Sequence, residues 1–225
     1  MTAAGDDLFD RLKAASADDW AAYVDHPFVR GLGDGTLPAE SFRHYLAQDY
    51  LFLIQFARAY ALAVFKGDTL EEMRAGAAGV SAILDEMSLH VRLCARWGLT
   101  AADLEGLPEA RATVAYTRYV LDTGQKGDLL DLQVALAPCV VGYAEIGRTL
   151  AARPGALDPA NPYRDWIAEY AGDGYLEVAR RSRAALDASA ALRMSEARFA
   201  RLAGIFRQAT RLEADFWQMG LSRAD

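Results

Sequence analysis

The stretch A-L-A-P-C-V-V-G-Y-A-E-I-G, residues 135–147, decides the fold because its apolar residues recur at helical spacing. At about 100° per residue, one face of this helix gathers apolar side chains around Cys139. They are Leu132, Ala135, Leu136, Tyr143, Ile146 and Leu150. The pattern predicts a helix over 128–152 with the thiol at the centre of its inward face. Pro138 lies well inside it and predicts a kink, because proline cannot donate the backbone hydrogen bond.

The same period recurs along the chain, and strand signals are almost absent. Apolar periodicity broken by Gly, Pro or Asp predicts about eight helices. Their ranges are 6–25, 37–66, 69–97, 109–122, 128–152, 162–170, 174–190 and 195–221. Residues 26–29 are interpreted as a turn, 31–36 as a Gly/Asp loop, and 101–105 as a single helical turn. We therefore expect an all-α helical bundle, with residues 1–225 forming a single domain.

Composition narrows the classes of function. The chain has 225 residues, 52% of them hydrophobic, and a formal net charge of −7. An acidic chain is a poor partner for nucleic acid or for an anionic membrane surface. Two cysteines give no disulfide framework, no apolar run approaches 18 residues, and the first ten residues lack the basic and apolar regions of a signal peptide. These features predict a cytoplasmic protein.

Carboxylates occupy positions where a helix should be apolar. Asp49 shares its helical face with Phe42, Tyr45, Phe52 and Phe56. Ionised carboxylates are rarely buried without a partner, since losing hydration costs several kcal/mol.

Two further acids follow the same pattern. Glu213 shares a face with Phe206 and Phe216, and Glu86 lies among Ala82 and Ile83 with His90 four residues on. One buried acid could be a structural polar bridge. Two or three, together with a centred cysteine and several tyrosines, favour a polar pocket.

Other site chemistries lack the necessary residues. The spacing of Glu86 and His90 occurs once and does not match a di-iron motif, and three histidines with two cysteines are too few for a zinc site. Nothing singles out His26 or His44 as a haem ligand, and no phosphate-binding loop is present. We therefore expect no metal and no cofactor.

Cysteine chemistry with help from a carboxylate remains, since a thiolate attacks carbon and a carboxylate can move the proton. Phe52, Tyr143 and Phe216 would suit a flat heteroaromatic ligand. Cys94 has no comparable set of carboxylates and aromatic residues around it and is interpreted as a core residue.

Seven motifs in order along nearly the whole chain carry a family resemblance. They are H-P-F-V-R-G-L-G-D-G-T-L-P (26–38), Y-L-A-Q-D-Y-L-F (45–52), E-M-S-L-H (86–90), A-Y-T (115–117), A-L-A-P-C-V-V-G-Y-A-E-I-G (135–147), N-P-Y-R-D-W-I-A-E-Y (161–170) and E-A-D-F-W (213–217). Through them the chain resembles the TenA/thiaminase II family, in its cysteine-containing branch. The resemblance implies a haem-oxygenase-like helical fold without haem, assembled as a homotetramer.

The resemblance also implies an activity, the hydrolysis of thiamin-related aminopyrimidines. The expected reaction converts 4-amino-5-aminomethyl-2-methylpyrimidine into the hydroxymethyl form with release of ammonia, for thiamin salvage. Cleavage of thiamin itself is a second possible reaction. The sequence leaves open which of these substrates is preferred. It also leaves open two other classes, a non-catalytic pyrimidine-binding or regulatory protein and a cofactor-independent oxidase on the same fold.

Residue roles follow from the matched motifs. Cys139 resembles the family nucleophile, Glu213 the acid/base that protonates a ring nitrogen, and Asp49 the acceptor that binds the aminopyrimidine edge. The matching pocket residues are Tyr116, Tyr143, Tyr170 and Phe216, with Phe52 where many relatives have tyrosine and with Glu86 and His90 in support. We expect Glu213 to be held partly neutral by its apolar surroundings and Asp49 to be ionised against the ligand. We also expect Gly142 to leave room beside the thiol.

Overall fold

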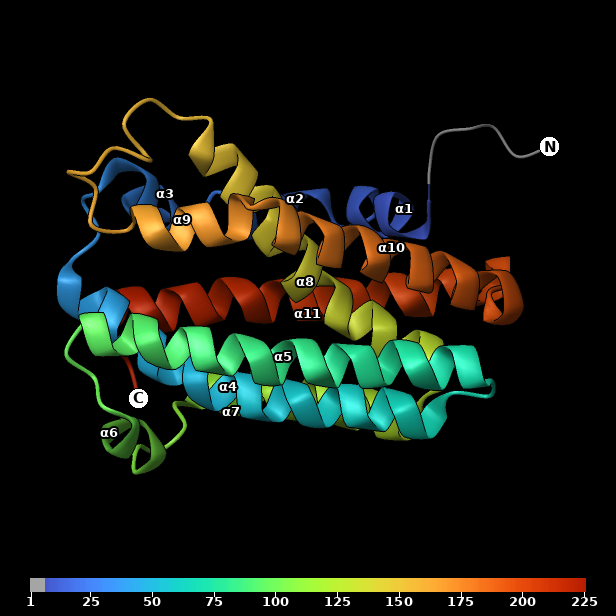
Figure 1. Ribbon diagram of the computed structural model, residues 1–225. Helices are drawn as coiled ribbons and strands as arrows, with labels where there is room; N and C mark the ends of the chain where they lie inside the picture. Colours follow the sequence, from blue (N-terminus) through green and yellow to red (C-terminus); the bar gives the residue numbers. More distant parts are fainter. Residues whose placement is uncertain (1–6) are drawn as a thin grey trace. The chain divides into compact units, whose positions relative to one another are not determined.

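The computed structural model describes residues 7–225, which form eleven α-helices and no strand (Figure 1). The predicted all-α class is confirmed. The chain divides into two compact units. Unit 1 contains Met1–Leu37 and Gln133–Ala214, and unit 2 contains Pro38–Leu132 and Asp215–Asp225. The single-domain organisation over residues 1–225 stays a prediction.

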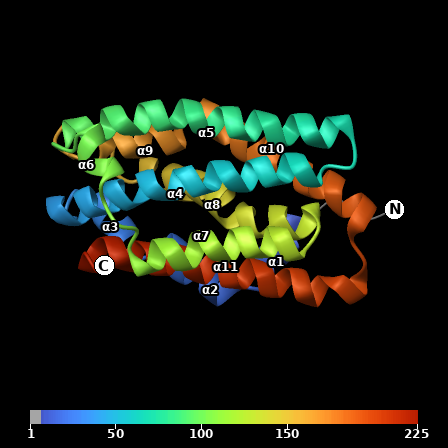
Figure 2. The ribbon, with the colours of Figure 1, turned by 90° about the horizontal axis from the view of Figure 1, so that it is seen from below.

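Unit 2 is built around one long helix, α4 (Ala39–Lys66), which begins after Pro38 and ends at Gly67. It lies between α5 (Leu70–Arg96) and α7 (Arg111–Lys126) and packs against both (Figure 2). The short helix α6 (Ala101–Glu105) lies in the connection from α5 to α7. It confirms the single helical turn predicted at 101–105. The side chain of Gln48 joins α4 to the start of α7. It donates to Pro108 O at 3.0 Å and accepts from Ala110 N at 2.8 Å.

Unit 1 begins differently from its prediction. The expected helix 6–25 is two helices, α1 (Leu8–Ala14) and α2 (Ala17–Val24). Ser16 leaves the helical conformation between them, and its N–H donates to Lys13 O at 3.0 Å in a tighter turn. The two helices bury separate apolar groups, Leu8, Phe9 and Leu12 on α1 and Trp20 and Tyr23 on α2.

The predicted turn and Gly/Asp loop at 26–36 are wrong. Residues Pro27–Asp34 form helix α3, and Gly35 caps its end. His26 caps the start through Nδ1, which accepts from Phe28 N at 3.2 Å, and Pro27 occupies the first turn, where its missing N–H costs nothing. The capping signal in His-Pro therefore outweighs the glycines inside the helix.

The remaining helices match their predicted ranges closely. They are α8 (Leu129–Ala151), α9 (Arg164–Ala171), α10 (Asp173–Arg193) and α11 (Glu196–Ser222). Both α8 and α11 run from one unit into the other. Helix α8 is long and apolar enough to cross a membrane by composition, but 83% of its most apolar window is buried, as in a core helix. Pro138 lies inside it, and the kink there stays a prediction.

Candidate active site

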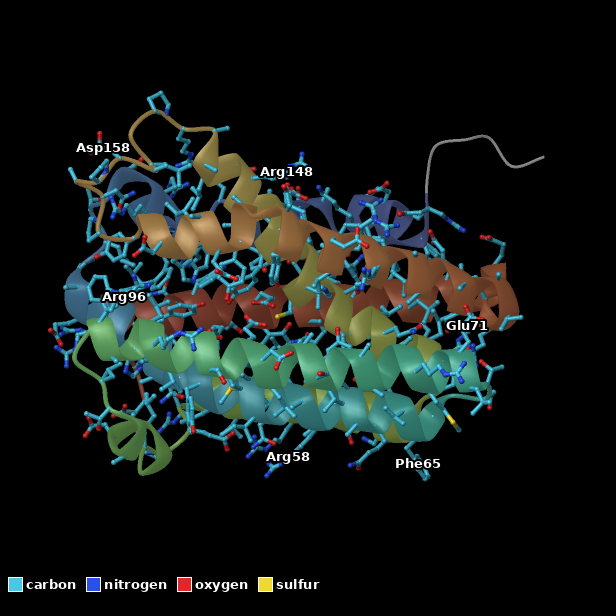
Figure 3. The ribbon with its side chains drawn as sticks, in the orientation of Figure 1. Arg58, Phe65, Glu71, Arg96, Arg148 and Asp158 are labelled. Carbon is cyan, nitrogen blue, oxygen red and sulfur yellow. The ribbon has the colours of Figure 1, made fainter. Side chains whose placement is uncertain are left out.

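Helix α4 presents an acidic group from its buried face. Tyr45, Asp49 and Phe52 follow helical spacing, and each is almost fully buried. Residues on the other side of α4 are exposed. Figure 3 shows Arg58 and Phe65 projecting outward, and Phe65 is 82% exposed. The predicted inward position of Asp49 is therefore confirmed.

The Asp49 carboxyl is held through one of its oxygens. Tyr45, one turn earlier on α4, donates its hydroxyl to Oδ2 at 3.3 Å. His90 Nδ1 on α5 lies 3.5 Å from the same oxygen. The other ring nitrogen of His90, Nε2, lies 2.8 Å from the carbonyl oxygen of Leu46. Because a carbonyl only accepts, Nε2 carries the proton and Nδ1 is the nitrogen that faces Asp49.

Burial disfavours charge on both members of this pair. It raises the pKa of Asp49 to about 7, against the opposing hydrogen bond from Tyr45. It also lowers the pKa of His90, against the opposing effects of the Leu46 carbonyl and of the Glu86 charge. A neutral imidazole beside a protonated carboxyl is therefore favoured over an ion pair, with one proton held between them. In the free protein Asp49 therefore takes up a proton near neutral pH. Its predicted ionisation against a bound ligand stays a prediction.

Aromatic side chains of unit 2 surround the next turn of α4. The Phe52 ring centroid lies 5.1 Å from that of Tyr116 on α7 and 5.5 Å from that of Phe216 on α11. Tyr45 also packs edge-on against Phe216, with centroids 6.0 Å apart. The structure thus brings together five of the predicted site residues in unit 2: Asp49, Phe52, His90, Tyr116 and Phe216.

Glu86 does not occupy the predicted apolar face of α5. It is half-buried, and Ala82 on the same predicted face is exposed. Ile83 and His90 are the buried residues there. Sequence reasoning placed the centre of that face too close to Glu86. The charge of Glu86 acts on His90, whose pKa it raises.

In unit 1, Cys139 lies on a buried face of α8 and is itself partly exposed. All six apolar residues predicted to share its face are buried. Cys139 is not in a disulfide, so it combines a defined position on the helix with a reduced, partly exposed side chain. Reactive cysteines require that combination.

Cys94 provides the contrast within the same chain. It is fully buried, its Sγ lies 4.0 Å from Leu46 O, and burial together with the Asp49 charge raises its pKa to about 12. A thiol in that state is not a nucleophile. The predicted core role of Cys94 is confirmed.

Tyr143 and Tyr170 are brought together in unit 1, with ring centroids 4.9 Å apart. Gly147 makes the approach possible. A Cβ there would lie 2.7 Å from Tyr170 O, so only glycine lets the end of α9 approach α8 so closely. Trp166, one turn before Tyr170, adds a third ring at 4.6 Å from Tyr170.

Glu213 is 1% exposed on α11. The predicted amphipathic pattern of this helix is confirmed. Phe206 and Ala209 on its face are buried, while Arg201 and Arg211 on the opposite face are exposed. Glu213 therefore belongs to the interior of unit 1, the unit that also contains Cys139, Tyr143 and Tyr170.

The sequence analysis did not predict Tyr45 and Trp166 as site residues, although each contacts one. Each lies four residues before a predicted site residue, Asp49 and Tyr170 respectively, and this spacing could have identified them. Among the described side chains, no three His, Cys, Asp or Glu residues group closely enough to hold a metal ion.

Comparison with known proteins places this chain in a family. Residues 14–223 match the model of the TENA/THI-4/PQQC family. A protein of Halalkalibacterium halodurans named aminopyrimidine aminohydrolase is 42% identical over 202 residues, which cover 89% of each chain.

Two solved structures add to this comparison. A TenA family protein of Silicibacter sp., described as a transcription regulator, superposes with a TM-score of 0.92 at 45% identity over 96% of both chains. A domain of unknown function from Shewanella denitrificans with a heme oxygenase-like fold gives a TM-score of 0.76 at 14% identity, over 96% of this chain and 92% of that one. The predicted haem-oxygenase-like fold is therefore confirmed. With nearly its full length matched, the chain belongs to the TENA/THI-4/PQQC family.

Proposed function

We propose that the protein hydrolyses aminopyrimidines related to thiamin, with Cys139 as the nucleophile. The observation that carries this function is a partly exposed cysteine, outside any disulfide, on an otherwise buried helix face. The likeness to an aminopyrimidine aminohydrolase at 42% identity supports the substrate class. The substrate we favour is 4-amino-5-aminomethyl-2-methylpyrimidine, and thiamin is the second candidate.

The chemistry divides into two halves. The Cys139 thiolate adds to the pyrimidine ring, which breaks its aromaticity, and the ring electrons expel the amine from the exocyclic methylene as ammonia. Water then adds to that methylene, and loss of the thiol restores the ring. Overall, one water enters and one ammonia leaves. Addition to the ring needs a proton on a ring nitrogen, and we assign that proton to the buried carboxyl of Glu213.

Asp49 is assigned to the aminopyrimidine edge, which presents an amino donor beside a ring nitrogen acceptor. A carboxyl with a pKa of about 7 can meet this edge in two ways. Protonated, it donates to the ring nitrogen and accepts from the amino group. Ionised, it accepts from both once the ring nitrogen carries the proton. Tyr45 and His90 hold Oδ2, which fixes the direction of the carboxyl.

The aromatic residues are assigned to the ring faces. Phe52 already contacts both Tyr116 and Phe216, and Tyr143 contacts Tyr170. A flat heteroaromatic ligand stacks well on such surfaces. We further propose a homotetramer without a cofactor, acting in the cytoplasm, where both cysteines would stay reduced.

Specific features bear on three other functions. A regulator that binds nucleic acid would need a basic surface, and the formal net charge is −7. An oxidase with several histidines at its site is disfavoured because His26 caps α3 and His44 lies 3.3 Å from Ala224 O near the chain end. A protein that only binds a pyrimidine would keep Asp49 and the aromatic rings but place no demand on Cys139.

Ammonia release separates the enzyme from the binding protein. We expect the wild type to release ammonia from the aminomethylpyrimidine and Cys139→Ser to lose nearly all turnover. Cys139→Ser should still bind the hydroxymethylpyrimidine product, measured by calorimetry. Cys94→Ala is the matched control, because Cys94 is a buried core thiol and its loss should leave turnover intact. Near wild-type turnover in Cys139→Ser would end the nucleophile assignment.

A further inference from the structure

A tyrosine from α2 contacts the turn of α8 that carries Cys139. Tyr23 is fully buried, and its hydroxyl donates to the carbonyl oxygen of Pro138 at 3.3 Å. That carbonyl belongs to the residue immediately before Cys139. The contact joins segments 115 positions apart in sequence, so helical periodicity gives no sign of it.

The contact lies at a proline inside α8. Pro138 has no N–H, so one internal hydrogen bond of the helix is missing, and the proline ring crowds the preceding turn. The backbone next to the thiol therefore has less support from its own helix. The Tyr23 hydroxyl supplies a hydrogen bond from outside the helix at this point.

Gly142 is the second half of the same contact. A Cβ at residue 142 would lie 2.6 Å from the Tyr23 hydroxyl oxygen and 2.9 Å from its Cζ. The space that we expected Gly142 to leave beside the thiol is thus filled by Tyr23. Glycine is required there because the Tyr23 ring packs against the helix backbone. Trp20 packs edge-on against Tyr23, with ring centroids 5.5 Å apart, and so supports the tyrosine ring.

We propose that Tyr23 is a positioning residue that fixes the α8 turn between Pro138 and Gly142, and with it the direction of the Cys139 thiol. The inference rests on the proposed function of Cys139. Tyr23 acts through the backbone and does not touch the substrate. Its loss should therefore lower the rate of the covalent step and leave substrate affinity unchanged, since small misplacements of a reacting atom are costly in rate.

Tyr23→Phe tests this directly, because it removes the hydroxyl and keeps the buried ring. We expect kcat for ammonia release to fall about tenfold, in line with the loss of one hydrogen bond. KM and the affinity for the product pyrimidine should stay at wild-type values. Amide hydrogen exchange of the peptide covering residues 135–147, followed by mass spectrometry, should become faster in the variant.

Tyr163→Phe is the matched control. Tyr163 is also buried in unit 1, and its hydroxyl donates to a backbone carbonyl, that of Leu37. The two variants lose the same kind of bond, and of these two bonds the one from Tyr23 is made to α8. Tyr163→Phe should therefore leave both kcat and the exchange of residues 135–147 unchanged.

The outcomes separate this inference from the proposed function. Wild-type exchange of residues 135–147 in Tyr23→Phe overturns the positioning role, whatever the turnover. Faster exchange with wild-type kcat, while Cys139→Ser is inactive, overturns the catalytic consequence. An active Cys139→Ser overturns the proposed function instead. Equal loss of kcat in Tyr23→Phe and Tyr163→Phe would show a general structural effect and would also sink the inference.

Discussion

Nδ1 of His90 lies 3.5 Å from Oδ2 of Asp49, and both side chains are almost fully buried. The distance is longer than a good hydrogen bond, and burial penalises a charge on either group. The two side chains therefore titrate as a pair that holds one proton. A ligand that brings its own amino group and ring nitrogen to this carboxyl can exchange that proton with it. The consequences for stability and for binding can be measured separately.

Stability should depend on pH through Asp49. Its pKa is 3.8 in the unfolded chain and about 7 in the folded protein, so between these values the folded state holds the extra proton. The free energy of unfolding then falls as pH rises from about 4 to about 7, by on the order of 4 kcal/mol. Urea unfolding at several pH values between 4 and 8 measures this slope.

The control for this slope is Asp49→Asn, which cannot titrate. Carboxylates with lowered pKa, such as Glu109 beside Arg118, act in the opposite direction in both proteins. Only the difference between wild type and variant therefore isolates Asp49. A difference that stays constant across pH 4 to 8 would contradict the raised pKa.

Asp49→Asn should also weaken binding of the product hydroxymethylpyrimidine, on the order of 100-fold. The Tyr45 hydroxyl donates to the Oδ2 position, which favours the amide oxygen there. The amide nitrogen would then face the ligand amino group, donor against donor. Calorimetry at pH 6, 7 and 8 should show the affinity loss and a flatter pH dependence. Unchanged affinity would remove Asp49 from the site.

His90→Asn should weaken product binding about tenfold, because the Asp49 carboxyl loses one of the two groups that hold its Oδ2. His44→Asn is the matched control. His44 lies on α4, half-buried, with a ring nitrogen 3.3 Å from Ala224 O, and no proposed site residue contacts it among the interactions described. Its affinity should equal that of the wild type. Equal losses in both variants would count against a specific role for His90.

The sequence predicted the parts of this protein that depend on local periodicity. The long helices α4, α5, α8 and α11 lie within a few residues of their predicted bounds. The helical periodicity that placed Asp49 and Glu213 on buried faces is confirmed. Short helices were harder to predict, because a single capping residue decides where each one begins or ends. His26 starts α3 and Ser16 divides α1 from α2. Contacts between distant segments, such as Tyr23 with Pro138, have no periodic signal at all.

The close approach of α8 and α9 yields the last prediction. Gly147→Ala would place a Cβ 2.8 Å from Ala171 N, against backbone that cannot rotate away. We expect a loss of about 1–3 kcal/mol in the free energy of unfolding and a lower kcat, because α9 must move and carry Tyr170 away from Tyr143. Gly204→Ala on α11 is the control. Nothing lies within 4 Å of its added Cβ, so the gain in helix propensity should stabilise the protein by up to about 1 kcal/mol. Urea unfolding and ammonia release, measured on both variants, check the pair. If Gly147→Ala were as stable and active as Gly204→Ala, the backbone contact that positions Tyr170 would have no role in the site.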